Sequence, residues 1–298
     1  MTTSADLFRA LGTLAEPPEP GHTAIADLLG LTGEPEPGDY ADVFLFSAYP
    51  YASIYVGPEG MLGGEARDRV AGFWRALGLT PPPEPDHLAA LLGLYAALVE
   101  DEARAVDAGD LAAAALRRES RKALLWEHLL SWLAPFLAKV EELAPPFYSG
   151  WAALLGDTLA GEVRTVGRQE LLPLHLREAP GLPDIDSSSA EWVSAIVAPV
   201  RSGVIVTRWD LRRSAAALGL GARVGERAFV LRSMLEQDAA GTVGWLADEA
   251  GRAAVDHGES EVLLGPVAAF WRRRAEACEV ALRSVQPANE EVVLSHGS

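Results

Sequence analysis

Apolar side chains recur at helical spacing along most of this 298-residue chain, and this periodicity constrains the possible folds more than any other feature. In the first half it predicts amphipathic helices over residues 65–77, 87–102, 111–144 and 147–163. Proline-rich breaks such as TPPPEP separate these segments, because proline cannot continue a helix. Runs that alternate apolar and polar residues are scarce, and GVIVT at 203–207 is the best strand candidate. The sequence therefore predicts an all-α fold.

The second half continues the helical pattern and also contains a recognisable helix start. Helices are predicted over residues 207–218, 226–237, 243–257 and 267–285. Thr207 and Asp210 have the spacing of a capping box, in which the side chain of each residue accepts a hydrogen bond from the backbone N–H of the other. In the first half, the aromatic stretch YPYASIYVGPEGMLGG has too many glycine and proline residues for a helix interior. We therefore expect an ordered, extended loop there.

The chain is strongly acidic, with a formal net charge of −17 at pH 7. Residues 1–163 carry 24 acidic and 10 basic side chains, whereas the remainder carries 18 and 15. Such a chain repels the phosphate backbone, which argues against general nucleic-acid binding and favours a basic peptide or a basic protein face as partner. Because 49% of the residues are hydrophobic, the chain can build a sizeable core.

The N-terminal sequence and the cysteine content indicate a cytoplasmic protein. The chain begins without the cationic start and apolar run of a secretory signal. No apolar run approaches the roughly 20 residues that span a bilayer, so we expect no membrane partner. The single cysteine, Cys278, cannot form an internal disulfide and is expected to be a small buried hydrophobic residue.

The stretch WEHLLSWLAPF, residues 126–136, combines a helical pattern with an acidic–histidine pair and a proline. Pro135 has no N–H, so it leaves the carbonyl of Ser131 without its helical donor. His128 falls at the edge of the apolar sector, either as a boundary histidine bonded within the fold or as part of a partner-binding surface. The six histidines lack metal-ligand spacing, and no nucleotide-binding or nucleophile motif occurs. We therefore expect no metal, no cofactor and no catalytic residue.

Three short motifs occur in order along the first half: PYASIY, EPDHL and WEHLLSWLAPF. On an acidic, helical framework they resemble the TorD/DmsD/NarJ family of maturation chaperones, which serve molybdenum-cofactor oxidoreductases. The resemblance covers about residues 1–165. The residues that carry it are Pro50, Tyr51, Ser53, Tyr55, Glu84, Pro85, Asp86, His87, Glu127, His128, Trp132, Pro135 and Phe136.

The resemblance implies a TorD-like helical chaperone domain at 1–165 and a protein that is not an enzyme. Beyond it, the mixed stretch that ends in DIDSSS predicts a linker at 166–189, and the helical pattern predicts a mainly helical extension of unknown role at 190–298. We expect a monomer or homodimer. A chaperone of this family binds the twin-arginine signal peptide or N-terminal region of an apo molybdopterin oxidoreductase and holds it until the cofactor is inserted. An acidic surface beside an apolar groove would complement that basic, apolar signal. The residues expected to bind the client are Tyr51, Ser53, Tyr55, Glu84, Asp86, His87, Glu127, His128 and Trp132.

The extension concentrates positive charge between residues 201 and 235. Its arginines there include Arg208, Arg212, Arg213, Arg223, Arg227 and Arg232. A helix, a glycine-containing turn and a second helix permit an alternative interpretation, a regulatory or adaptor protein whose helix-turn-helix-like module contacts DNA or protein. The same segment also fits a helical hairpin that covers the chaperone domain or contacts the client or a second copy. The sequence leaves these interpretations open.

Overall fold

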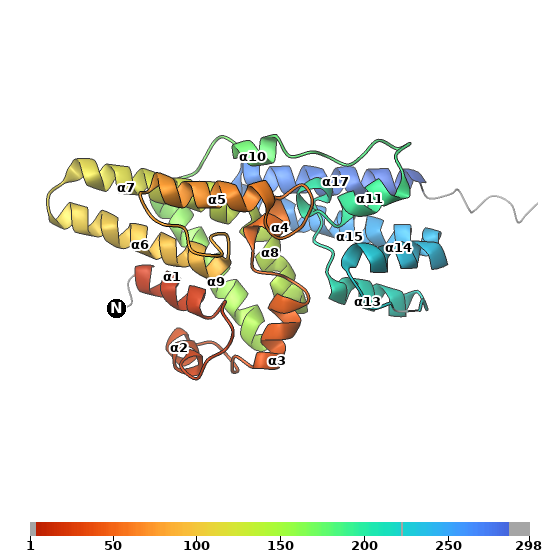
Figure 1. The fold of residues 1–298 in the computed structure, drawn as a ribbon, viewed down its shortest axis with the longest axis horizontal. Helices are drawn as coiled ribbons and strands as arrows, with labels where there is room; N and C mark the ends of the chain where they lie inside the picture. The colour runs from red at the N-terminus through yellow and green to blue at the C-terminus, as the bar shows by residue number, and fades with distance from the viewer. Residues whose placement is uncertain (1–3, 222, 286–298) are drawn as a thin grey trace, which may run out of the picture.

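The computed structural model describes residues 4–221 and 223–285, and every regular element in these ranges is helical (Figure 1). The predicted all-α fold is therefore confirmed for the described residues. The strand candidate is not a strand, because residues 204–207 only connect two helices. Their apolar side chains are buried among helices, a setting that a short apolar run occupies as readily as a sheet.

The first half of the chain is a bundle in which α6 and α7 form a helical hairpin, α1 packs on α6, and α8 packs on α9. Figure 1 shows this hairpin at one end of the molecule and α8 near its middle. The long helix predicted over 111–144 is continuous but contains a π-helical turn, η2. The elements are α1 (Ser4–Thr13), α2 (His22–Leu29), α3 (Pro37–Tyr40), π-helical η1 (Ala41–Leu45), α4 (Ala52–Val56), α5 (Gly64–Ala76), α6 (Leu88–Asp107), α7 (Leu111–Ala123), η2 (Leu124–Leu129), α8 (Leu130–Leu143) and α9 (Pro146–Val166).

The aromatic stretch expected to be an extended loop contains the short helix α4, so that prediction was wrong for residues 52–56. A distant residue supplies the acceptors for the first turn. The carbonyl of Asp86 accepts from the Ala52 N–H at 3.0 Å, and the Asp86 carboxylate accepts from the Ser53 N–H at 3.1 Å. These bonds satisfy N–H groups that a helix leaves unpaired at its start. Local composition cannot reveal a helix that is capped from another segment.

The second half forms a smaller group of helices beside the bundle. The long helices α15 and α17 pack side by side, α14 packs on α15, and α13 packs on α14 (Figure 1). The capping box predicted at Thr207 and Asp210 is confirmed at the start of α13. The elements are α10 (Leu174–Arg177), α11 (Ser189–Ile196), α12 (Pro199–Ser202), α13 (Arg208–Ala217), α14 (Arg227–Gln237), α15 (Ala239–Glu259), α16 (Glu261–Leu264) and α17 (Pro266–Val285).

The helix α17 belongs to both hydrophobic cores. Its first turns contribute Phe270 and Trp271 to the core of the bundle. Its later turns contribute Cys278 and Leu282 to the core of the second half. Cys278 is free and buried, as expected. One rigid helix therefore connects the two halves through apolar packing.

The proline inside α8 marks the point where α17 attaches. Because Pro135 has no N–H, the carbonyl of Ser131 cannot receive its α-helical hydrogen bond. The indole N–H of Trp271 donates to that carbonyl at 3.0 Å, and both residues are 1% exposed. A buried carbonyl without a donor is costly, so this bond ties the second half to the bundle.

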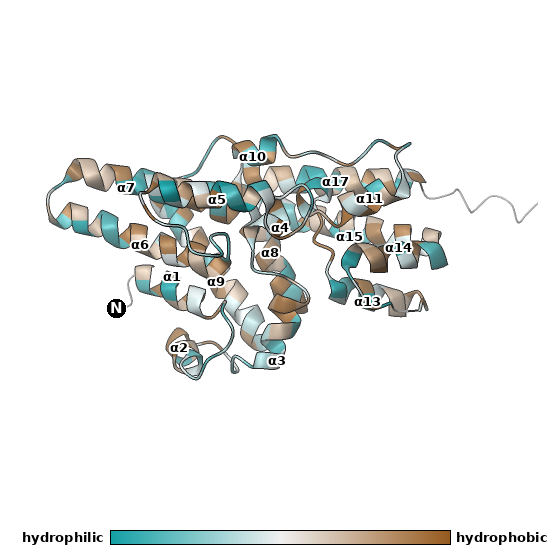
Figure 2. Ribbon diagram, in the orientation of Figure 1, coloured by the Kyte–Doolittle hydropathy of each residue, from teal (hydrophilic) through white to brown (hydrophobic). Residues whose placement is uncertain are grey.

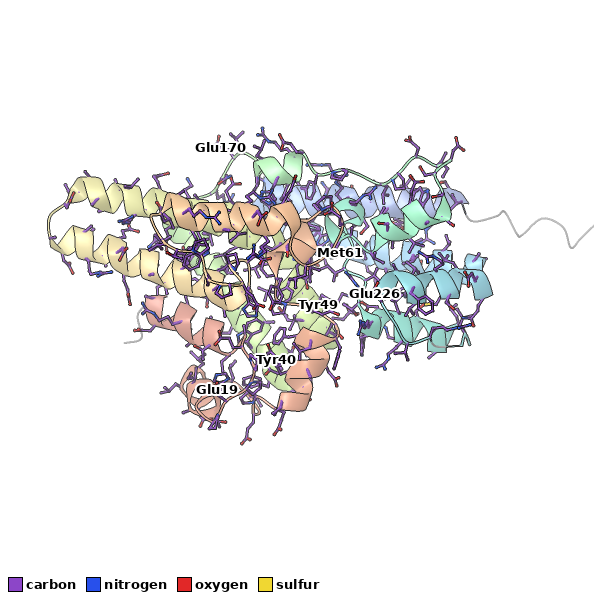
Figure 3. The ribbon with its side chains drawn as sticks, in the orientation of Figure 1. Glu19, Tyr40, Tyr49, Met61, Glu170 and Glu226 are labelled. Carbon is purple, nitrogen blue, oxygen red and sulfur yellow. The ribbon has the colours of Figure 1, made fainter. Side chains whose placement is uncertain are left out.

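Two polar contacts reinforce the same junction. The Arg227 guanidinium donates to the carbonyls of Val206 and Gly60, each at 3.1 Å. Figure 3 labels Met61 and Glu226, the residues next to Gly60 and Arg227 in the sequence, at the boundary between the halves. The Lys139 ammonium lies 3.3 Å from the Asp210 carboxylate, which also caps α13.

Among the described residues, no helix combines the length and the apolar character that a membrane span requires.

Candidate functional site

The first group of predicted client-binding residues gathers where α4 and α6 begin. Tyr51 forms an isolated bridge with His87, and its hydroxyl donates to the Glu84 carboxylate at 2.9 Å. The His87 ring accepts at Nδ1 from the Ala89 N–H and so caps α6. Burial raises the pKa of Tyr51, an effect strengthened by Glu84, and burial lowers the pKa of His87. At neutral pH the cluster therefore holds one exposed carboxylate beside a neutral tyrosine and a neutral imidazole.

Ser53 and Asp86 belong to the same group but are buried. Ser53 is 0% exposed and Asp86 is 1% exposed. The Asp86 carboxylate accepts from the Ser53 N–H, and the Ser53 hydroxyl accepts from the Gly63 N–H at 3.1 Å. These two side chains hold α4 and the following loop in place, and they have almost no surface to offer a partner.

Tyr55 and Trp132 lie deeper, in the core between the first group and the Glu127–His128 pair. Their rings stack with centroids 5.2 Å apart and an interplanar angle of 11°. The Tyr55 hydroxyl donates to the carbonyl of Tyr49, and the Trp132 indole donates to the carbonyl of His128 at 2.8 Å. Both side chains are buried and hydrogen-bonded, as large aromatic residues in a core usually are.

Glu127 and His128 lie on η2, beneath a segment that follows α9. The Gln169 amide donates to the Glu127 carboxylate at 3.2 Å, and the Trp126 indole donates to the carbonyl of Gly167. His175 of α10 lies 3.8 Å from the same carboxylate. The Glu127 side chain keeps 34% of its surface exposed. Part of the segment predicted as a linker thus covers this pair.

His128 is neutral in this environment. Burial and, to a smaller extent, the nearby Arg69 cation together lower its pKa to about 4. Burial and Arg69 likewise lower the pKa of His175, to about 3. The His128 ring packs on Phe73 with centroids 4.8 Å apart. A neutral His175 cannot form an ion pair with Glu127, so at neutral pH the hydrogen-bond donor to that carboxylate is the Gln169 amide. The Arg69 cation acts on Glu127 only through a charge interaction without a hydrogen bond.

A cavity of about 490 Å³ lies elsewhere, at the junction of the two halves. Its lining residues from the bundle are Asp42, Val43, Phe46, Ser47, Leu143 and Pro145. Its lining residues from the second half are Arg208, Trp209, Leu211, Arg212, Arg223, Val224, Gly225 and Val230. None of the nine predicted client-binding residues lines it. Sequence reasoning singled out the arginines but could not place them beside η1, because only tertiary packing brings the two segments together.

These features define a helical domain. The described residues contain no cluster of histidine, cysteine or carboxylate side chains that could hold a metal ion. The members of the predicted site that keep solvent-accessible surface are Tyr51, Glu84, His87 and Glu127.

Comparison with known families identifies the domain. Residues 34–138 match the family model of the nitrate reductase delta subunit, and this region contains all nine predicted site residues. The chain therefore contains a chaperone domain of the NarJ/TorD family. Members of this family are non-catalytic chaperones of molybdoenzyme maturation and bind a molybdoenzyme subunit. No curated protein matches the chain in a sequence search.

Proposed function

We propose that this protein is a cytoplasmic maturation chaperone that binds the twin-arginine signal peptide, or the N-terminal region, of an apo molybdenum-cofactor oxidoreductase. In this proposal it holds the client until the cofactor is inserted. The observation that carries the proposal is the family match over residues 34–138. The acidic surface of the chain supports it, because a net charge of −17 attracts a cationic signal.

The proposal divides the nine residues into two roles. Tyr51, Glu84, His87 and Glu127 have accessible surface and would contact the client. The two carboxylates among them would accept bidentate, charge-assisted hydrogen bonds from the arginine pair. The buried residues would keep these contact groups in position through the contacts described above. They are Ser53, Tyr55, Asp86, His128 and Trp132.

Glu127 would exchange one partner for another when the client binds. It now accepts a hydrogen bond from the uncharged Gln169 amide. A guanidinium donates a stronger, charge-assisted bond to the same carboxylate, so a client arginine would displace the amide. The segment after α9, which packs over Glu127 and His128, would then move away from Glu127 as part of the proposed binding step.

The test is fluorescence anisotropy with a labelled synthetic twin-arginine signal peptide and the full-length protein. Glu84→Gln combined with Glu127→Gln removes both charges and keeps the side-chain shapes. A charge-assisted bond contributes about 1.5–3 kcal/mol, against about 0.5–1.5 kcal/mol for the neutral bond that glutamine can still accept. A loss of about 1 kcal/mol at each of the two positions should lower the affinity by about 30-fold. Added salt should weaken wild-type binding, and a peptide with lysine for both arginines should bind less tightly.

The matched control is Glu19→Gln combined with Glu119→Gln, which makes the same charge change at exposed positions outside the site. Figure 3 shows Glu19 beside α2, away from the α4–α5 region. Wild-type affinity is expected for this control. Equal weakening in both double variants would mean that only overall charge matters, and unchanged affinity in Glu84→Gln/Glu127→Gln would refute the site.

A further inference from the structure

We propose that the cavity at the junction of the two halves is a second peptide-binding groove, specific for an extended segment that alternates acidic and apolar residues. The inference does not rest on the client site proposed above, because none of those nine residues lines this groove. The groove also has the opposite charge, since arginines line it in a chain that is acidic overall.

The cationic wall consists of Arg208, Arg212 and Arg223. None of the three forms an ion pair with another described residue, and the Nε atom of Arg208 is buried without a hydrogen-bond partner. Arg213, one position along α13, instead lies 3.2 Å from Glu249 and 3.3 Å from Glu142. Acidic side chains are thus within reach of this helix, yet none forms an ion pair with the arginines facing the cavity. Asp42 lines the opposite wall of the same cavity and is not paired with any of the three. A carboxylate from another chain would supply the missing partner.

The opposite wall is mainly apolar and comes from the bundle. Val43, Phe46, Leu143 and Pro145 line it. Figure 2 shows the segment after α3, which contains η1, as hydrophobic. The Phe46 side chain is 49% exposed, and Val224 at the rim is 91% exposed. Apolar surface therefore continues beyond the cavity, which favours a peptide over a small anion such as phosphate, because a small anion would leave this surface uncovered.

The spacing of the arginines specifies the conformation of the ligand. Arg208 and Arg212 are four residues apart on α13, which places them about 6 Å apart along one helix face. In an extended chain, alternate residues point to one side and lie about 6.6 Å apart. Two acidic residues separated by one position can therefore meet both arginines. The apolar residues between them point the other way, toward Val43 and Phe46.

The structure around these arginines also argues against the alternative interpretation as a DNA-binding helix-turn-helix. The helices α13 and α14 are separated by residues 218–226, a longer connection than the three or four residues of a helix-turn-helix. The arginines lie in a recess opposite η1 rather than on a convex face that could enter a DNA groove.

The experiment uses the full-length protein and a labelled synthetic peptide of alternating glutamate and leucine. Arg212→Glu combined with Arg223→Glu reverses two charges in the wall. Both side chains are exposed and lack partners, so the variant should fold, which circular dichroism checks. We expect the affinity for the peptide to fall at least tenfold in this variant. It should remain unchanged in Arg232→Glu, an exposed α14 arginine outside the groove.

Several results would overturn the inference. Equal affinity for a lysine–leucine peptide would show nonspecific apolar adhesion. Unchanged binding of the glutamate–leucine peptide in Arg212→Glu/Arg223→Glu would show that the groove is not the site. Displacement of the peptide by stoichiometric pyrophosphate would indicate a small-anion site. Wild-type binding of duplex DNA, lost in the same variant without any peptide binding, would indicate a nucleic-acid surface. The twin-arginine peptide is measured in parallel, so that failure of either site is seen separately.

Discussion

The hydrogen bond between Trp271 and the carbonyl of Ser131 should couple energetically to Pro135. In the wild type the indole is the donor that replaces the N–H that proline lacks. Trp271→Phe removes the indole N–H and leaves a buried carbonyl unpaired. In a Pro135→Ala background, the alanine N–H can donate to the same carbonyl. The cost of Trp271→Phe should therefore be smaller when residue 135 is alanine.

The magnitude follows from the burial of this contact. Ser131 and Trp271 are each 1% exposed, so water cannot replace the lost donor. An orphaned buried acceptor costs about 1–3 kcal/mol, and the smaller phenylalanine ring adds a packing loss that is the same in both backgrounds. The double-mutant cycle subtracts the packing loss and leaves a coupling energy of about 1–2 kcal/mol.

The assay is urea unfolding of the four proteins of the cycle, followed by circular dichroism. Trp151→Phe is the matched control, because the Trp151 indole donates in the same core to the carbonyl of Leu11 at 2.9 Å, a helical carbonyl that Pro135 does not affect. Its cost should be the same with proline or alanine at position 135. A coupling energy below about 0.3 kcal/mol between Trp271 and Pro135 would refute the reasoning, because independent sites add within that range.

Two further predictions concern stability, and urea unfolding measures both. His128 has its pKa lowered to about 4 in the fold, whereas an unfolded histidine titrates near 6.5, so the unfolded chain binds more protons below pH 6.5. The difference in free energy of unfolding between the wild type and His128→Gln should be constant above pH 6.5. It should shift against the wild type by about 3 kcal/mol as the pH drops toward 4. A difference that does not change with pH would contradict a neutral His128 in the fold. Gly203→Ala should cost about 1–3 kcal/mol more than Gly219→Ala. Both glycines have positive φ, but only at Gly203 would an added Cβ lie 2.2 Å from the backbone nitrogen of Ala275; equal costs would show that this approach relaxes.

The candidate site shows what short sequence motifs can predict and what they cannot. The motifs around Tyr51, Asp86 and Trp132 indicated the family, which the match over residues 34–138 confirms. They did not indicate which side chains reach the surface. A helical wheel placed His128 at the edge of the apolar face, but its side chain is only 7% exposed because distant residues such as Phe73 of α5 pack against its ring. Client binding by these residues stays a prediction that the peptide experiment tests.

The sequence by itself determined the long amphipathic helices, the capping box at Thr207 and the carbonyl of Ser131 that Pro135 leaves without a helical donor. Each of these depends on residues within about one helical turn, where periodicity and hydrogen-bonding groups can be read directly. Tertiary structure alone decided which distant residues would complete them. Asp86 caps α4 from 33 residues away, and Trp271 reaches the Ser131 carbonyl across 140 residues. Tertiary structure also placed three arginines opposite an apolar wall. Contacts of this kind depend on the packing of the whole chain and not on the residue spacing within one segment.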